Sequence, residues 1–353
     1  MTDVAAPETA TAGPDPRRAA RRALVFVAFL ALLAVAVRAL PGLGDVRERF
    51  ASAAPAWLAA AILCELASVA SFPVALRGAF ARIMPWRPAF ALGLVEQGTN
   101  VLVPAGGTGG LAFGAVLLQR RGVPSAFAAT RTVALFLSTS LMTFLAIIAS
   151  GMAIALGADG GDIPGYAGAL VAAGAAAVLG AAVLIGRLPA SVAVHRGRLM
   201  ALIARLRDWL TDGMRVTIAL LRRGDVLLIA GSLGYLAFDI AALAAMFQAL
   251  GGGAPAAAAF VLAYTLGQAG SLIPTPAGVG GTEASLIGMF VLCGTSLSAA
   301  TASVLAYRVL QLGVPALLGT LASIDLRRMI RTGPTAAEIA ERHADDPRMT
   351  DYR

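Results

Sequence analysis

The chain of 353 residues is 58% hydrophobic and only 14% charged, with a formal net charge of +8. A single water-surrounded core of ordinary proportions cannot bury that much apolar surface, so the composition excludes a soluble globular domain. Every basic residue is arginine, and the arginines lie mainly at the ends of apolar runs. This distribution is typical of membrane proteins and not of nucleic-acid-binding surfaces. We therefore predict a membrane protein that is not an enzyme, because no soluble region is large enough for a catalytic domain.

The apolar runs, taken in chain order, are long enough to cross a bilayer several times. A hydrocarbon core roughly 30 Å thick needs about 20 apolar residues per helix. The runs predict about six full spans, at residues 24–40, 57–76, 126–156, 166–186, 226–250 and 299–324. We expect an all-α polytopic helix bundle that occupies residues 23–331.

Both ends of the chain are polar. Residues 1–22 carry four arginines just before the first apolar run, which predicts a disordered leader on the cytoplasmic side. A cleaved signal peptide is the alternative interpretation, but the run 24–40 is long for a signal and Pro41-Gly42 is a poor cleavage site. Residues 332–353 follow an arginine cluster and predict a polar cytoplasmic tail.

Two apolar regions between the spans are interrupted by glycine and proline. The first, 90–118, is interrupted at 104–110, and the second, 256–293, is interrupted at 274–281. The arm over 90–103 would be about 21 Å long at roughly 1.5 Å per residue, which is short for a span. Each region therefore predicts a re-entrant hairpin.

The arginines also predict the orientation of these hairpins. Arg87 before the first region and Arg121 after it both favour the cytoplasm, so this hairpin enters and leaves on the cytoplasmic side. The loop 157–165 lacks arginine and is expected outside, whereas the arginine-rich linker 187–225 is expected inside. The second hairpin then enters from the outside. Residues 199–221 alternate apolar and basic residues at helical spacing, which favours a surface amphipathic helix or a solvated linker helix.

The two halves of the chain, about 23–156 and 166–326, are predicted to form an inverted repeat. Each reads as two spans, a hairpin and one span, starting on opposite sides of the membrane. A shift of 171 positions places three glycines of the first interruption on three of the second: Gly107, Gly109 and Gly110 on Gly278, Gly280 and Gly281. Many transporters have this plan, with the substrate near the bilayer midplane. The alternative is ordinary helix packing through small residues.

The hairpin tips have a specific chemistry. Irregular backbone at membrane depth leaves peptide groups unpaired, so it implies a polar cavity. Short helices expected to begin near Gly110 and Gly281 would direct free N–H groups toward the midplane, where they favour an anion such as a lipid phosphate. We expect no metal or cofactor, because His195 and His343 are far apart in polar stretches and both cysteines lie in apolar segments.

Ionisable residues inside predicted spans indicate function, because they are costly in lipid. They are Glu65, Glu96, Arg131, Asp239, Glu283 and Arg308. We predict two pairs, Glu96 with Arg131 and Glu283 with Arg308; buried structural salt bridges are the alternative, and Arg131 could instead extend to the interface. The candidate substrate-binding residues are Asn100, Pro104, Gly107, Gly110, Arg131, Asp239, Gln268, Pro274, Pro276, Gly278, Gly280, Glu283, Tyr307 and Arg308.

A proline- and glycine-rich motif of the second half is the most specific signal. It reads Pro274-Thr275-Pro276-Ala277-Gly278-Val279-Gly280-Gly281-Thr282-Glu283, with Tyr307-Arg308 downstream; the first half has Asn100-Val101-Leu102-Val103-Pro104 before its glycines. With these motifs the chain resembles the lysylphosphatidylglycerol synthase transmembrane (flippase-like) family. Ala277 stands where that family usually has glycine, and Gly110-Leu111 replaces a commoner Gly-Glu.

The resemblance implies a lipid flippase-like protein of the bacterial inner (plasma) membrane, with both termini cytoplasmic. Its substrate would be an anionic or aminoacylated phospholipid or a polyprenyl-phosphate lipid. No aminoacyl-transfer domain follows residue 331, so we expect another protein to make any aminoacylated lipid. Direct ATP use is not expected, since no P-loop is present. The alternatives are a small-solute secondary transporter and a non-transporting membrane partner of a glycosyltransferase or lipid synthase.

Overall fold

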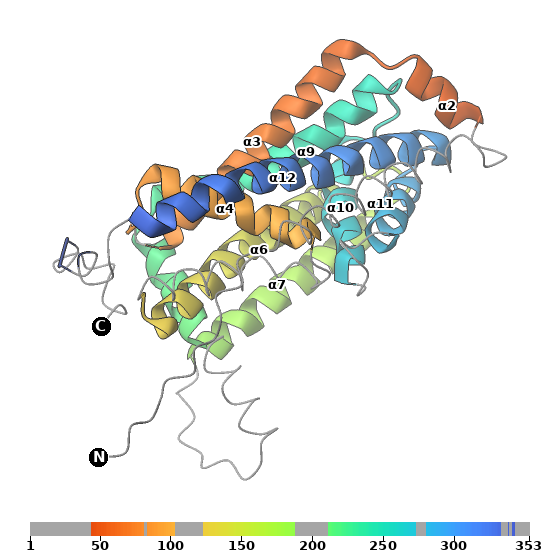
Figure 1. Ribbon diagram of the computed structural model, residues 1–353. Helices are drawn as coiled ribbons and strands as arrows, with labels where there is room; N and C mark the ends of the chain where they lie inside the picture. The colour runs from red at the N-terminus through yellow and green to blue at the C-terminus, as the bar shows by residue number, and fades with distance from the viewer. Residues whose placement is uncertain are drawn as a thin grey trace, which may run out of the picture. The chain divides into compact units, whose positions relative to one another are not determined.

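A computed structural model describes residues 44–80, 83–102, 123–187, 211–272 and 280–332, together with residues 338, 341 and 342. All of them belong to the second of two compact units, Gly44–Arg353. The described residues form helices and short loops, with no β-strand among them (Figure 1). The expected span at 24–40 and most of both Gly/Pro interruptions lie outside the described residues.

Five of the described helices are long and apolar enough to cross a membrane. They are α3 (Pro55–Ala79), α6 (Ser125–Ala155), α7 (Gly165–Arg187), α9 (Val226–Ala249) and α12 (Leu297–Thr332). These helices confirm an apolar helix of sufficient length at each of the five expected spans that fall within the described residues. α12 continues past its expected end at Ile324, into the basic stretch that follows.

Shorter helices flank the interruptions. α4 (Trp86–Leu102) precedes the first interruption. α10 (Ala257–Gly267) and the 3-10 helix η1 (Gln268–Leu272) precede the second, and α11 (Gly281–Leu292) follows it. A further short helix, α2 (Gly44–Ala51), lies before α3. At roughly 1.5 Å per residue, α11 is only about 18 Å long, which is less than the apolar thickness of a bilayer. The structure thus confirms a helix beginning at Gly281. Residues 211–222 are also helical.

The antiparallel pair α3 and α9 makes the most extensive contact between described helices. Small residues let the backbones approach, because a Cβ atom at Gly78 would collide with Leu228 and one at Gly231 would collide with Ala75. Farther along the pair, the hydroxyl of Ser68 donates to the carbonyl oxygen of Tyr235 over 2.8 Å. These contacts fix the register of the two helices.

The start of α9 is set by a local cap. Asp225 precedes the helix, and its Oδ1 accepts hydrogen bonds from the N–H groups of Leu227 at 3.1 Å and Leu228 at 3.2 Å. A side-chain oxygen at this position satisfies N–H groups that have no partner within the helix. The cap therefore begins α9 where it can pack against Gly78 of α3.

A second close crossing joins α4 to α12. A Cβ atom at Gly98 would lie 2.9 Å from the carbonyl oxygen of Pro315, and one at Gly319 would lie 2.6 Å from the carbonyl oxygen of Leu94. Only glycine fits at such a crossing without moving a backbone. α4 is thereby fixed against α12.

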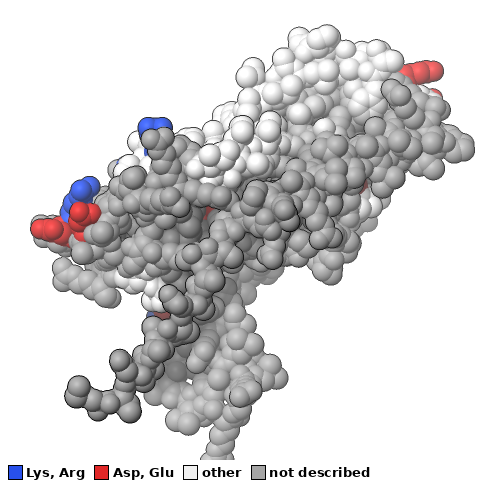
Figure 2. Space-filling view, in the orientation of Figure 1, with Lys and Arg blue, Asp and Glu red and all other residues white. Residues whose placement is uncertain are grey.

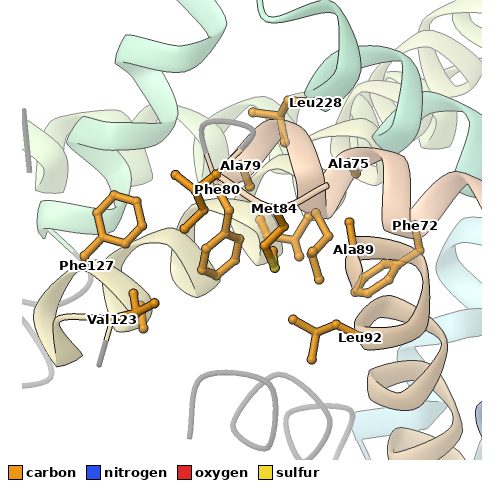
Figure 3. Close-up of a cluster of buried hydrophobic side chains, with 14 of the residues drawn as sticks. Phe72, Ala75, Ala79, Phe80, Met84, Ala89, Leu92, Val123, Phe127 and Leu228 are labelled. Atoms are coloured by element: carbon orange, nitrogen blue, oxygen red, sulfur yellow. The ribbon is translucent and has the colours of Figure 1, made fainter. Parts of the chain in front are cut away.

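Two apolar clusters fill the interior of the described helices. One gathers side chains of α3, α4, α6 and α9 with the loop after α3, and Figure 3 shows Phe80, Met84 and Phe127 among them. The other is built around Phe290 of α11, whose ring centroid lies 4.9 Å from those of both Phe247 and Phe260. The second cluster is directly beside the polar residues described below.

The outer surface of these helices is largely apolar. Large aliphatic side chains are exposed, for example Leu156, Leu170 and Leu184. On the face shown in Figure 2, most of the described surface is uncharged. Such a surface is suited to lipid rather than to water.

Candidate functional site

A buried carboxylate, Asp239 of α9, is the centre of a polar network. Its Oδ1 accepts a hydrogen bond from the hydroxyl of Tyr307 at 2.6 Å. Its Oδ2 accepts hydrogen bonds from the hydroxyl of Tyr264 and, at 3.3 Å, from the side-chain amide of Gln311. Gln268 extends the network, because its Nε2 lies 3.4 Å from the Tyr307 oxygen. Three donors thus hold one carboxylate in an otherwise apolar interior.

The network continues through an ion pair. The Nε of Arg308 donates to Oε1 of Glu283 at 2.7 Å, and its Nη1 donates to Oε1 of Gln311 at 2.5 Å. The other oxygen of Glu283 accepts the backbone N–H of Gly280 at 2.6 Å. Gly280 has a φ of +86°, a conformation that glycine adopts without strain. The ion pair therefore ties α12 to the residue where the second interruption ends.

The fold brings these side chains together from five elements. Asp239 lies on α9, Tyr264 on α10, Gln268 on η1, and Glu283 on α11, whereas Tyr307, Arg308 and Gln311 share one stretch of α12. The spacing of Tyr307 and Gln311 by four residues places both on one face of α12. Because charges separated from water need partners, the hydrogen bonds described above are what make this buried site tolerable.

Glu65 of α3 lies beside this network. α3 and α9 are antiparallel, because Ala75 contacts Gly231 and, farther along, Ser68 contacts Tyr235. One turn beyond the second contact, Glu65 of α3 lies level with Asp239 of α9. The two carboxyl groups interact electrostatically. Glu65 is 2% exposed, and its Oε2 has no hydrogen-bond partner among the described residues. The site therefore holds more acidic groups than basic ones.

The structure brings together six of the residues that the sequence singled out for the site. They are Asp239, Gln268, Gly280, Glu283, Tyr307 and Arg308. The ion pair expected between Glu283 and Arg308 is confirmed. Asn100 lies near the end of α4 and is half-buried. The positions of Pro104, Gly107, Gly110, Pro274, Pro276 and Gly278 lie outside the described residues.

Arg131 and Glu96 differ from the expected pair. Arg131 is buried, its Nη1 donates to the carbonyl oxygen of Ala79 at 3.0 Å, and its guanidinium lies 4.9 Å from the ring centroid of Phe127. No ion pair joins it to Glu96 within the described part of the chain, where Oε2 of Glu96 has no hydrogen-bond partner. The contacts with Ala79 and Phe127 hold the Arg131 side chain against the end of α3, where it is 2% exposed.

Two network residues, Tyr264 and Gln311, were not singled out by sequence reasoning. Each is a lone polar residue in an apolar helix, a pattern that also occurs where side chains simply bridge helices. A usable signal was their spacing, since Tyr264 lies four residues before Gln268 and Gln311 lies three residues after Arg308. Polar residues at these spacings share a helix face.

The start of α11 differs in one respect from the expected anion site. Its N–H groups do lie next to the network, but Glu283 already accepts the N–H of Gly280. A carboxylate within the first turn also interacts favourably with the positive end of the helix dipole. An external anion at this place would add to, or replace, a negative charge that the protein itself supplies.

A comparison with protein families places the chain in a known family. The family model described as "Lysylphosphatidylglycerol synthase TM region" matches residues 22–319, which include the whole polar network. The chain belongs to this family. It matches none of the curated protein sequences with which it was compared.

Membership of the lysylphosphatidylglycerol synthase TM region family and the five apolar helices together identify a multi-pass membrane protein. The matched region runs from before α2 into α12.

Proposed function

We propose that the protein is a lipid flippase of the bacterial plasma membrane, which moves an anionic or aminoacylated phospholipid or a polyprenyl-phosphate lipid between leaflets. The observation that carries the proposal is the buried network of Asp239, Glu283 and Arg308 at the end of a Gly/Pro-rich interruption. A charged site inside apolar helices suits a polar headgroup, while the lipid chains stay in the bilayer. Both termini would lie in the cytoplasm.

The helix boundaries support an inverted repeat. α3 begins at residue 55 and α9 at residue 226, and α4 begins at residue 86 and α10 at residue 257, a separation of 171 positions in both cases. This is the same shift that aligns the glycines of the two interruptions. Helix packing follows the same relation, since α4 packs on α12 and α10 packs on α6. In transporters with this plan, the substrate binds between the two halves.

The shortness of α10 and α11 supports re-entrant hairpins. The two helices pack on one another, and a Cβ atom at Gly267 would lie 2.7 Å from the side chain of Leu286. Neither helix reaches the length of a span, and both lead to residues 273–279. A hairpin whose tip lies at membrane depth would place its backbone groups beside Glu283 and Gln268. We propose that the headgroup binds there.

The test is leaflet exchange in liposomes. Purified protein is reconstituted with fluorescent lipids that carry zwitterionic, anionic, aminoacylated or polyprenyl-phosphate headgroups, and dithionite quenching reports the outer-leaflet fraction. We expect faster exchange than in protein-free liposomes for at least one headgroup. Glu283→Gln should slow it by about tenfold or more, which corresponds to about 1.4 kcal/mol in the barrier.

Asp212→Asn is the matched control. It also removes one acidic charge and one ion pair, since Asp212 pairs with Arg215 at 3.3 Å, but this pair is exposed and lies outside the network. It should leave the exchange rate unchanged. Background exchange for every headgroup would contradict the proposal; uptake of a soluble solute without lipid exchange would favour a small-solute transporter.

A further inference from the structure

Glu65 is a buried acid that makes no hydrogen bond to the described residues of the polar network. It lies on α3 among side chains of the second apolar cluster, which includes its neighbours Ala61 and Cys64. Its Oε2 has no hydrogen-bond partner among the described residues. A polar oxygen removed from water and left without a partner is unfavourable, so it indicates that something else binds it.

The position of Glu65 on α3 brings its carboxyl group close to a second carboxylate. The register of α3 and α9 places Glu65 level with Asp239, and the two groups interact electrostatically. Glu65 is only 2% exposed, and Tyr307 of α12 donates to the same Asp239. Glu65 therefore faces the interior site and not the lipid.

Charged and titratable groups lie on each helix that packs on α3 or borders the network. They include Cys64 on α3, Tyr235 and Asp239 on α9, Glu96 on α4, Arg131 on α6, Tyr264 on α10, Glu283 on α11, and Tyr307 and Arg308 on α12. Arg308 already bonds to Glu283 and Gln311, and Arg131 bonds to the far end of α3. Two carboxylates thus face one another in an apolar interior, where like charges repel strongly.

The donors around Asp239 favour a proton over a metal ion as the missing partner. Both oxygens of Asp239 accept hydrogen bonds, from Tyr264, Tyr307 and Gln311, so their lone pairs face donors and not an empty position. The described residues contain no group of three or more histidine, cysteine or acidic side chains placed to hold a metal. Sodium or calcium would need several free oxygens, whereas a proton needs one.

We propose that the carboxyl group of Glu65 is the proton-binding site that couples lipid movement to the proton gradient. Hydronium on one side of the membrane supplies the proton, an O–H bond forms at Glu65, and water on the other side accepts the proton on release. Proton binding removes the repulsion between Glu65 and Asp239, and proton release restores it, so the α3–α9 contact has two states of different energy. This inference rests on the lipid translocation proposed above.

The test measures lipid distribution under an imposed pH difference. One pH unit is a tenfold ratio of proton activity, so a cycle that moves one proton per lipid shifts the ratio of labelled lipid between leaflets by up to about tenfold, equivalent to about 1.4 kcal/mol. We expect this shift for the wild type and none for Glu65→Gln. Infrared difference spectra of the same proteoliposomes should show a protonated carboxyl band that titrates in the wild type and is missing in Glu65→Gln.

Two further variants separate coupling from folding. Glu65→Asp keeps the carboxyl group and should retain the response to the gradient. Leu63→Ala changes a position of α3 close to Glu65 that is 66% exposed, removes no charge, and should respond as the wild type does. Two results would overturn the proton coupling but leave the proposed lipid translocation standing. One is lipid exchange in the wild type that does not depend on the pH gradient, and the other is a gradient response that Glu65→Gln retains. If the wild type moves no lipid at any gradient, the proposed function fails, and the coupling fails with it.

Discussion

Glu283 connects Arg308 to the backbone of Gly280, because one of its carboxylate oxygens accepts from the arginine and the other from the N–H of the glycine. The ion pair therefore does two things at once. It neutralises two charges in an apolar interior, and it holds the first turn of α11 against α12. Any movement of the start of α11 relative to α12 has to change this contact.

Breaking the ion pair from one side should destabilise the protein. Arg308→Met leaves Glu283 buried without its cation, and removal of one partner of a buried pair costs about 3–5 kcal/mol. Adding Glu283→Gln to Arg308→Met should recover part of this loss, because the uncompensated charge is gone. The free energy of unfolding in a detergent titration measures both variants. Additive effects of the two changes would show that the residues are not coupled in the folded state.

Each tyrosine that donates to Asp239 should contribute separately. Tyr307→Phe or Tyr264→Phe removes one hydrogen bond to a charged acceptor, and such bonds contribute about 1.5–3 kcal/mol. Tyr166→Phe is the control, because Tyr166 is 73% exposed at the start of α7. The same detergent titration applies. A loss for Tyr307→Phe no larger than that for Tyr166→Phe would mean that the network does not stabilise the helices.

The spans could be predicted from sequence because each depends on a local run of apolar residues. The central ion pair could be predicted because a lone charge in lipid is unfavourable. A long run of mostly apolar residues predicts a helix in lipid, and this reasoning located α3, α6, α7, α9 and α12. A lone charge inside an apolar segment is costly, and this cost pointed to Glu283 and Arg308 as a pair.

The remaining site residues depend on helix packing, which a single sequence does not encode locally. Tyr264 and Gln311 reach Asp239 only because α10 and α12 meet α9 at this level. Arg131 fails to pair with Glu96 for a similar reason, since the end of α3 offers it the carbonyl oxygen of Ala79. The register of α3 and α9, which places Glu65 beside Asp239, is likewise set by where small residues let the backbones touch.

The crossing of α4 and α12 should be sensitive to a single methyl group. Gly98→Ala would place a Cβ atom 2.9 Å from the carbonyl oxygen of Pro315, and overpacking of this kind costs about 1–3 kcal/mol. Gly174→Ala in α7 is the matched control, because a Cβ atom there meets nothing within 4 Å. It should stabilise α7 by up to about 1 kcal/mol through helix propensity. Equal effects of the two substitutions on unfolding would contradict the close crossing.

The proposed first hairpin predicts that both of its ends can be labelled from the same side. In a variant without Cys64 and Cys293, Arg87→Cys and Arg121→Cys are tested one at a time with a membrane-impermeant maleimide in intact cells and in inverted vesicles. Because the hairpin returns to the side from which it enters, both should be labelled only in inverted vesicles, as expected for the cytoplasmic side.

The loop between α6 and α7 supplies the reference for this experiment. Asp159 lies in the loop between α6 and α7, which lacks arginine and is predicted to lie outside, so Asp159→Cys should be labelled in intact cells. Labelling of Arg87→Cys and Arg121→Cys from opposite sides would mean that residues 90–118 cross the membrane. The second half would then no longer be inverted relative to the first, and a binding site shared between opposed hairpins would lose its structural basis.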